Sequence, residues 1–162
     1  MAKDIKGKNF SANNTTGKRR KSDFYETPYS MTSHLLESED FDKSLTVCEP
    51  ACGAGAISNI LQKDFNSVVA YDIEKDFLLE PGQYDYIITN PPFSLAYEFV
   101  EKAKQVATKK FAFLLPLSYL HGKKRYDGIY MDKQYGLKKV YVFTRYPMLG
   151  DTLREDGKYN TG

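Results

Sequence analysis

The sequence has little cysteine and no long apolar segment, and both absences exclude classes of protein. No stretch approaches the roughly 18 consecutive apolar residues of a membrane-spanning helix, and the N-terminus lacks the apolar core of a secretory signal, so we expect a cytoplasmic protein. The two cysteines, Cys48 and Cys52, lie too close together for a disulfide framework, and no further pair of Cys or His residues completes a zinc site. We therefore expect reduced, structural thiols and no bound metal.

The distribution of charge says more than its net value. The 162 residues, 41% hydrophobic and 27% charged, fit one globular domain with a net charge of +2. Residues 1–23 carry seven Lys or Arg and two acids, residues 101–125 carry seven and one, and residues 24–100 between them are acidic. The two basic blocks are suited to contact a polyanion, and the acidic segment between them is suited to bind a small cationic ligand. The alternative is a solvated surface with a flexible tail, which composition alone favours.

The chain divides into a tail and one domain. Residues 1–22 are polar and lack apolar periodicity, so we expect a flexible basic arm before a domain over residues 23–162. A helix is predicted from Pro28, with Thr27 as its cap. Short apolar runs then alternate with helix-length segments, which predicts a three-layer α/β/α sandwich with a mostly parallel sheet. The predicted strands are Leu45–Cys48, Val68–Tyr71, Tyr84–Thr89, Phe111–Leu115 and Val140–Phe143, and the predicted helices between them are Ala54–Asp64, Ser94–Thr108 and Arg125–Lys133.

Parallel sheets bind ligands at the carboxyl ends of their strands, and three such ends carry unusual residues. The first strand runs into EPACGAG, where Gly53 and Gly55 let a ligand approach the backbone and the start of the next helix. Ser58 replaces the third glycine of a dinucleotide fingerprint, and the Glu49 carboxylate suits a cationic amino acid moiety better than a pyrophosphate. Asp72 follows the second strand, where an acid is placed to accept hydrogen bonds from ribose hydroxyls.

The third strand ends in Asn90-Pro91-Pro92-Phe93. The prolines lack donors and fix the backbone, so the loop becomes a rigid cluster of acceptors beside an aromatic ring. That arrangement suits a planar substrate with an amino group, because Asn90 and the Pro91 carbonyl can accept from the amine while Phe93 stacks on the ring. The alternative is a simple strand-ending turn with Phe93 in the core.

The segments DFYETP, EPACGAG, YDIEKD and NPPF occur in this order within residues 22–150. Together they resemble the amino-group DNA methyltransferases that use S-adenosylmethionine, in particular the adenine-specific enzymes of phages and bacteria. The resemblance implies a Rossmann-like methyltransferase fold and transfer of a methyl group to the exocyclic N6 amino group of an adenine flipped out of the DNA duplex. It implies S-adenosylmethionine as cofactor and DNA as partner.

The resemblance also implies roles for individual residues. Those expected to hold the cofactor are Tyr25, Thr27 and Pro28 over its methionine part, Glu49, Pro50, Ala51, Gly53 and Gly55 around its amino acid moiety, and Asp72, Ile73, Asp76 and Phe77 around its ribose and adenine. The catalytic loop is expected to be Asn90, Pro91, Pro92 and Phe93. The residues expected to contact DNA are Lys123, Lys124, Arg125, Arg145 and Tyr146.

The sequence departs from the family in its recognition region. No target-recognition domain fits between Gly55 and Asn90, and most residues after Phe93 are needed for the sheet. We therefore expect modest sequence specificity from residues 118–135 and the basic arm, or specificity from a separate partner or a second copy of the chain. The last residues, 157–162, read as a loop with no closing strand, so either the sheet is one or two strands short or the chain is truncated.

Two other functions stay open. The first is methyl transfer to an amide or amine of protein or RNA, because NPP-aromatic loops serve those planar amino groups too. The second is a catalytically silent relative that binds nucleic acid. The DFYETP segment and the two basic blocks favour DNA over protein or RNA as the acceptor, and Asn90→Ala separates the enzyme from the silent relative.

Overall fold

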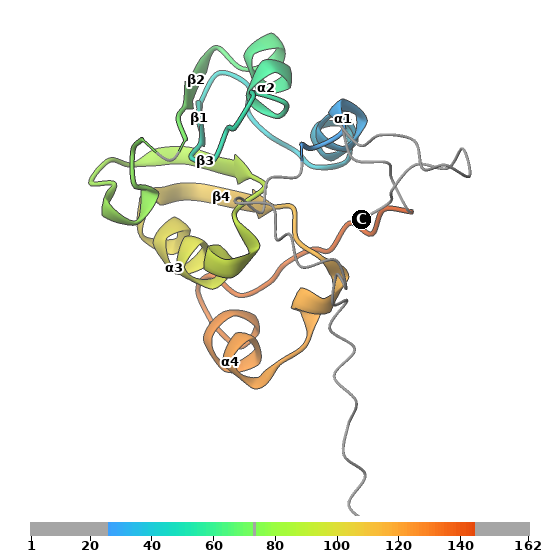
Figure 1. Cartoon of the computed structure of the whole chain (residues 1–162), viewed down its shortest axis with the longest axis vertical. Coiled ribbons are helices and arrows are strands. Elements are labelled where there is room, and N and C mark those ends of the chain that lie inside the picture. The colour runs from blue at the N-terminus through green and yellow to red at the C-terminus, as the bar shows by residue number, and fades with distance from the viewer. Residues whose placement is uncertain (1–25, 73, 145–162) are drawn as a thin grey trace, which may run out of the picture.

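A computed structural model describes residues 26–72 and 74–144, in which helices alternate with parallel strands (Figure 1). The predicted arm, Tyr25, Ile73, Arg145, Tyr146 and the closing loop lie outside the described residues. The strands are β1 (Thr46–Glu49), β2 (Ser67–Ala70), β3 (Tyr84–Thr89) and β4 (Ala107–Phe113). The α-helices are α1 (Tyr29–Ser38), α2 (Ser58–Asp64), α3 (Ala96–Val106) and α4 (Lys123–Arg125). The 3-10 helices are η1 (Phe77–Leu79), η2 (Phe93–Leu95) and η3 (Leu117–Leu120), and a π-helix η4 (Tyr126–Tyr130) continues α4.

The described strands form one parallel sheet in the order β2-β1-β3-β4. Glu49 at the end of β1 lies opposite Ala70 at the end of β2, and Cys48 lies opposite Ile87 of β3. The chain proceeds from β1 to one side and then crosses to the other side for β3, so the strand order reverses between β1 and β3. Ligands of open α/β sheets bind at such a reversal, at the carboxyl ends of the strands.

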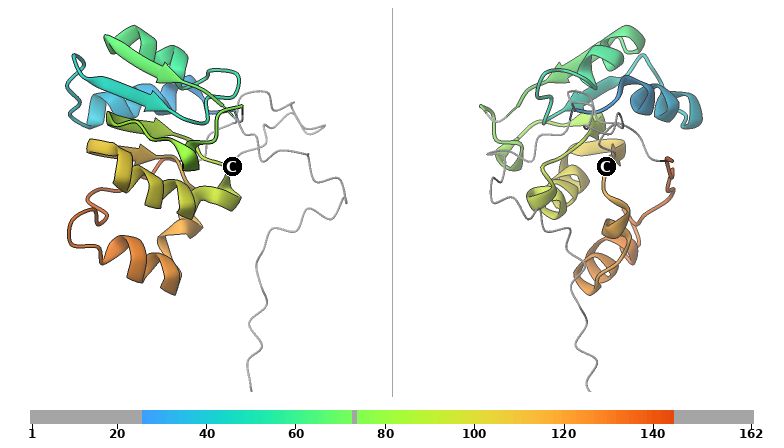
Figure 2. Two further views of the ribbon diagram at one scale, coloured as in Figure 1. Left: turned by 90° about the vertical axis from the view of Figure 1, so that its left-hand side faces the viewer. Right: turned by 45° about the vertical axis from the view of Figure 1, so that its right-hand side comes forward.

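Helices cover both faces of the sheet, as alternation along the strands requires. Cys48 and Ile87 point to one face, where they pack with Phe99 and other residues of α3. Val47 and Tyr86 point to the other face, where they pack with α2 and partly buried leucines of α1. Figure 2 shows α3 on the opposite side of the sheet from α1 and α2. The predicted three-layer α/β/α sandwich with a parallel sheet is therefore confirmed.

Some predicted boundaries are wrong for local reasons. The helix predicted from Ala54 begins at Ser58, because Gly53 and Gly55 have positive φ angles of 49° and 90° that a right-handed helix does not accommodate. The helix predicted to run to Thr108 ends at Val106, and β4 begins at the next residue. After Ala107, the first half of β4 is polar, with Thr108 and Lys109 exposed, so an apolar run does not mark it. The helix predicted at Arg125–Lys133 instead spans α4 and η4.

The strand predicted at Val140–Phe143 does not form. Val140 and Val142 are 48% and 69% exposed, whereas a strand buried on both faces would have hidden them. Neighbouring side chains bind the end of α1 instead: the Tyr141 hydroxyl donates to Glu39 Oε2 at 2.6 Å, and Lys139 Nζ donates to the same oxygen at 2.8 Å. A β-branched, aromatic run predicts an extended backbone but does not specify its pairing partner.

Candidate functional site

The site is built where β1 and β3 end side by side. Two backbone hydrogen bonds join the loop after β1 to the end of β2: Tyr71 N–H donates to the Glu49 carbonyl at 3.1 Å, and Cys52 N–H donates to the Tyr71 carbonyl at 3.0 Å. These bonds hold the EPACGAG turn beside Tyr71 and therefore beside Asp72, whose side chain is half-buried. The structure thus brings Glu49 and Asp72 to one edge of the sheet, next to the end of β3.

The glycine turn is held by its own backbone. Gly55 N–H donates to the Cys52 carbonyl at 2.7 Å, and Asn59 N–H donates to the Gly55 carbonyl at 2.9 Å. At Gly55, with φ of 90°, a side chain would be strained, and an added Cβ would lie 3.3–3.4 Å from side-chain atoms of Asn59 and Ser58. Glycine at this position therefore keeps the turn open and close to α2. Pro50 is buried and Ala51 is partly buried within the same turn.

Glu49 is a buried carboxylate, only 1% exposed. Burial raises the pKa of the Glu49 carboxyl to about 7, although hydrogen bonds from the side chain and backbone of Ser58 act to lower it. The carboxylate oxygen Oε2 is buried and has no hydrogen-bond partner among the residues that the structure describes. Buried polar atoms of native proteins are almost always paired, so this oxygen is expected to bind a donor from a ligand or water.

The loop after β3 is joined to the segment before α1. Asn90 Nδ2 donates to Thr27 Oγ1 at 3.1 Å, across 63 residues of sequence. The prediction that Thr27 caps the helix is wrong, because Pro28 occupies the N-cap position without any side-chain cap and the helix begins at Tyr29. The Thr27 side chain, 4% exposed, contacts the loop instead. Pro28 is buried beside it.

The two prolines and the aromatic residue of the loop differ in exposure. Pro91 is fully buried, and Pro92 and Phe93 are half-buried. The Pro92 carbonyl accepts from Leu95 N–H at 2.9 Å, which starts η2. The loop is thus held at both of its ends, by β3 and by η2, and the Phe93 ring lies at its partly exposed side. Phe93 is therefore not fully buried in the core, as a simple strand-ending turn would have it.

Asp76 and Phe77, the residues predicted to contact the cofactor adenine, have their side chains engaged elsewhere in the fold. The exposed Asp76 carboxylate caps η1 by accepting from Leu78 N–H at 2.9 Å. Phe77 is 2% exposed, and its ring packs on Phe99 with 5.0 Å between ring centroids. The Phe77 side chain is therefore placed in the core beneath α3 and not on an open surface, which corrects the expectation that its ring faces a cofactor.

The two cysteines are free thiols, as expected. Burial raises the pKa of the Cys48 thiol to about 12, and burial also raises the pKa of Cys52, so neither is activated as a nucleophile. Across the described residues, no group of three or more His, Cys, Asp or Glu side chains could hold a metal ion. No helix in this part of the chain is long and apolar enough to cross a membrane.

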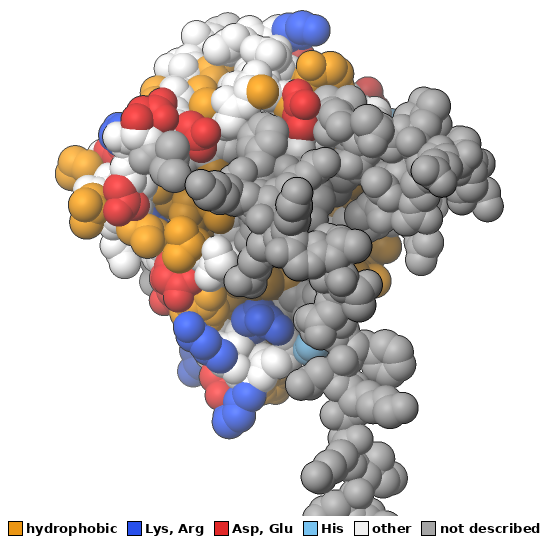
Figure 3. All heavy atoms as spheres, in the orientation of Figure 1, with side chains coloured by type: hydrophobic (Ala, Val, Ile, Leu, Met, Phe, Trp, Pro, Cys, Tyr) orange, Lys and Arg blue, Asp and Glu red, His pale blue; other side chains and the backbone are white. Residues whose placement is uncertain are grey.

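The basic segment lies on α4, where Lys and Arg side chains gather at the lower part of the molecule (Figure 3). Lys123 is 87% exposed and pairs with Asp127 at 2.5 Å. Lys124 Nζ lies 3.9 Å from the centroid of the Tyr97 ring, at the start of α3. Arg125 donates from Nε and Nη2 to the His121 carbonyl, so its guanidinium already holds the chain. The two lysines are therefore the better candidates for contacts with a partner.

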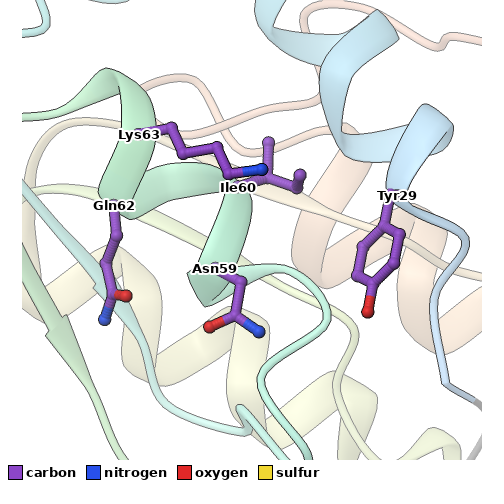
Figure 4. Close-up of a pocket in the computed structure, with 5 residues that line it drawn as sticks. All are labelled: Tyr29, Asn59, Ile60, Gln62 and Lys63. Carbon is purple, nitrogen blue, oxygen red and sulfur yellow. The ribbon is translucent and has the colours of Figure 1, made fainter.

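An open hollow of about 540 Å³ borders the glycine turn (Figure 4). It lies between the start of α1 and α2, with Tyr29 on one side and Asn59 on the other (Figure 4). Its remaining lining residues are Ile60, Gln62 and Lys63. Neither Glu49 nor Asn90 lines it, so the hollow adjoins the predicted cofactor site without containing it.

Sequence reasoning missed two partners within the site. Ser58 stands out in the sequence only as a departure from a glycine fingerprint, but in the structure it is the hydrogen-bond partner of Glu49. Thr27 fits a helix cap, but it binds Asn90. The signal in the sequence that pointed to Ser58 was that it replaces the third glycine of the dinucleotide fingerprint.

Comparisons with known proteins add little to this geometry. No protein-family model and no curated protein matches the sequence. Among solved structures, the chain is similar to a candidate RNA methyltransferase from Pyrococcus horikoshii, with 16% identity and a TM-score of 0.47 over 65% of this chain and 69% of that one. A likeness of this strength does not identify a family, so the function is argued from the site.

Proposed function

We propose that the protein transfers a methyl group from S-adenosylmethionine to the exocyclic amino group of adenine in DNA. The observation that supports this most strongly is the pairing of two strand ends at the reversal of the sheet. β1 ends in a buried acid and a glycine turn, and its neighbour β3 ends in Asn90-Pro91-Pro92-Phe93. The first suits a small cationic cofactor, and the second suits a planar amine.

The residues at the end of β1 fit the amino acid part of such a cofactor. Glu49 Oε2 is buried and lacks a partner, and an ammonium group would supply one together with the opposite charge. Gly55 has no side chain to fill the space next to Asn59 and Ser58, so a ligand can approach the backbone of the turn. Asp72, half-buried after β2, is placed for ribose hydroxyls. When bound, the cofactor supplies a methyl group on a sulfonium, which makes it an electrophile.

The residues at the end of β3 supply positioning and local electrostatics. Asn90 and the Pro91 carbonyl accept the two amine hydrogens, which raises electron density on the nitrogen and aims its lone pair at the methyl group. With the cofactor bound, the nitrogen–carbon bond would form as the carbon–sulfur bond breaks, and the surplus proton on nitrogen would leave to solvent. Phe93 stacks on the substrate ring. Positioning and preorganised hydrogen bonds of this kind account for large rate enhancements without a nucleophile.

Charge near the loop supports a nucleic acid as substrate. Lys124 lies over Tyr97, which belongs to the first turn of α3 and follows Phe93 closely in sequence. Lys123 beside it is almost fully exposed. Lys124 over Tyr97 and the exposed Lys123 are suited to the phosphates around an extruded nucleotide.

The test is transfer of labelled methyl from S-adenosylmethionine to unmethylated DNA, followed by digestion to nucleosides. We expect label in N6-methyl-2′-deoxyadenosine from the wild type and at least a 100-fold lower rate from Asn90→Ala. The matched control is Asn66→Ala, an exposed asparagine just before β2 at the opposite edge of the sheet, which should keep the wild-type rate.

The same assay with RNA and with protein as acceptor separates the alternatives. Label in RNA or protein and none in DNA would overturn the substrate assignment but keep methyl transfer. No label with any acceptor, despite measurable cofactor binding, would overturn methyl transfer itself and favour a silent nucleic-acid-binding protein.

A further inference from the structure

One contact in the site is made by two segments that are remote in sequence. Thr27 Oγ1 accepts a hydrogen bond of 3.1 Å from Asn90 Nδ2. Thr27 is 4% exposed and stands directly before Pro28, at the start of α1. A threonine there would ordinarily cap the helix and stabilise its first turn. The chain leaves α1 without a side-chain cap and uses the hydroxyl to hold the loop.

The contact fixes which way the asparagine amide faces. A side-chain amide is planar, with two donor hydrogens on nitrogen and an acceptor oxygen on the opposite corner. Its last torsion is broad and roughly two-fold, so hydrogen bonds such as the one to Thr27 decide which of the two atoms faces the substrate. When the nitrogen donates to Thr27, the oxygen is turned away from Thr27. The backbone on either side is already held, because Thr89 and Pro91 are both buried.

We propose that Thr27 is a positioning residue for methyl transfer, which fixes the Asn90 amide so that its oxygen is presented as acceptor to the substrate amine. This inference rests on the proposed function, because it assigns Asn90 the acceptor role. It also differs from the role implied by the sequence resemblance, in which Thr27 packs over the methionine part of the cofactor. The two roles make different predictions for cofactor affinity.

The experiment compares Thr27→Val, which keeps the shape of the side chain and removes the hydroxyl, with Thr27→Ser, which keeps the hydroxyl. For Thr27→Val we expect kcat for methyl transfer to fall about tenfold, which corresponds to about 1.4 kcal/mol of transition-state stabilisation. The cofactor dissociation constant, measured by calorimetry, should stay within about twofold, and Thr27→Ser should restore most of kcat. The matched control is Thr32→Val, a second buried threonine in α1, which should leave kcat unchanged.

A second measurement does not depend on activity. In the full chain labelled with nitrogen-15, the side-chain amide signals of Asn90 are assigned by their loss in Asn90→Ala. Their exchange with solvent is then compared between wild type and Thr27→Val, and we expect faster exchange in the variant.

Each outcome decides a separate point. Unchanged amide exchange in Thr27→Val would overturn the positioning role, and so would a loss of cofactor affinity as large as the loss of kcat. If the wild type transfers methyl to no acceptor, the proposed function fails, and Thr27 can then be called only a structural partner of Asn90, which the amide exchange would show. If Thr27→Val does not fold, Thr27→Ser and the amide exchange rate of the wild type decide the question. Rapid exchange of the Asn90 side-chain amide in the wild type would also contradict the inference.

Discussion

Two glutamates ten positions apart, Glu39 and Glu49, have opposite surroundings. Glu39, just after α1, accepts from Lys110 at 2.7 Å and from Lys139 and Tyr141 at 2.8 and 2.6 Å. These hydrogen bonds lower the pKa of Glu39 to about 2. Glu49, at the end of β1, is more deeply buried, accepts hydrogen bonds from Ser58 within the described part of the chain, and has a pKa raised by burial to about 7. One carboxylate is saturated with donors, and the other has an oxygen without a donor.

The contrast separates a structural charge from a functional one. Glu39 contributes to folding, because Lys139 and Tyr141 fasten residues 139–141 to the end of α1 and Lys110 joins β4 to the same carboxylate. Glu49 opposes folding at neutral pH, because its ionisation in a buried position is unfavourable. A protein keeps such a group at a cost in stability when a ligand supplies the missing partner. The same residue type therefore marks the scaffold in one place and the candidate cofactor site in the other.

The largest expected effect is that of Glu49→Gln, which should weaken cofactor binding and stabilise the protein. Loss of a charge-assisted hydrogen bond should raise the dissociation constant for S-adenosylmethionine about 10- to 100-fold, measured by calorimetry. The folded-state pKa of about 7 lies above the ordinary 4.5, so wild-type stability falls as pH rises through this window. At pH 8 the variant should be more stable than the wild type by up to about 3 kcal/mol, and at pH 4.5 the two should be equal.

Urea denaturation at both pH values, together with the binding titration, tests this pair of effects. The control is Glu37→Gln, an exposed glutamate on α1, which should change neither quantity. A variant that loses stability at pH 8 would show that the ionised Glu49 already has a stabilising partner. Unchanged cofactor affinity would remove Glu49 from the proposed site.

The second expected effect is that of Glu39→Gln, which should lower stability and leave cofactor binding alone. The pKa of Glu39 is lowered from 4.5 to about 2, so its stabilising contribution is complete above pH 4.5 and is lost as pH falls toward 2. The lysine partners are partly exposed, so we expect a loss of only about 1 kcal/mol at pH 7. Urea denaturation at pH 7 and pH 3.5 measures the difference, which should shrink at the lower pH. A change in cofactor affinity would contradict the division between the two glutamates.

The sequence predicted the parallel α/β/α architecture because burial patterns and strand ends are local signals. Tyr84–Thr89 is a strand with the predicted bounds, since Asn90 and a proline pair follow it and end the pairing. An apolar run that does not pair in the sheet has the same composition as a strand, so the sequence does not distinguish the two. Val140–Phe143 has the composition of a strand, but its position is decided by Glu39, about 100 residues earlier.

The candidate site was predicted as a set of positions and not as a set of contacts. Glu49, Gly55 and Asn90 could be placed from strand ends because the topology of parallel sheets fixes that edge. The partners Ser58 and Thr27 could not be assigned, because each contact depends on how separate elements pack. The burial of Phe77 was missed for the same reason: its ring is covered by Phe99 of α3.

The third expected effect concerns Lys123 and Lys124, which extend the comparison to cations outside the sheet. Replacing both with Gln should weaken DNA binding about 10-fold in 0.1 M salt and lower the slope of log affinity against log salt by about 2, one phosphate contact for each lysine. Fluorescence anisotropy over a salt series measures both quantities, with Lys109→Gln, an exposed lysine in the polar half of β4, as the control. Because each lysine already has an acidic partner, Asp127 or Glu98, a DNA phosphate must displace that partner. An unchanged salt slope would therefore show that α4 keeps its internal pairs, and the DNA-binding charge would have to lie elsewhere in the chain.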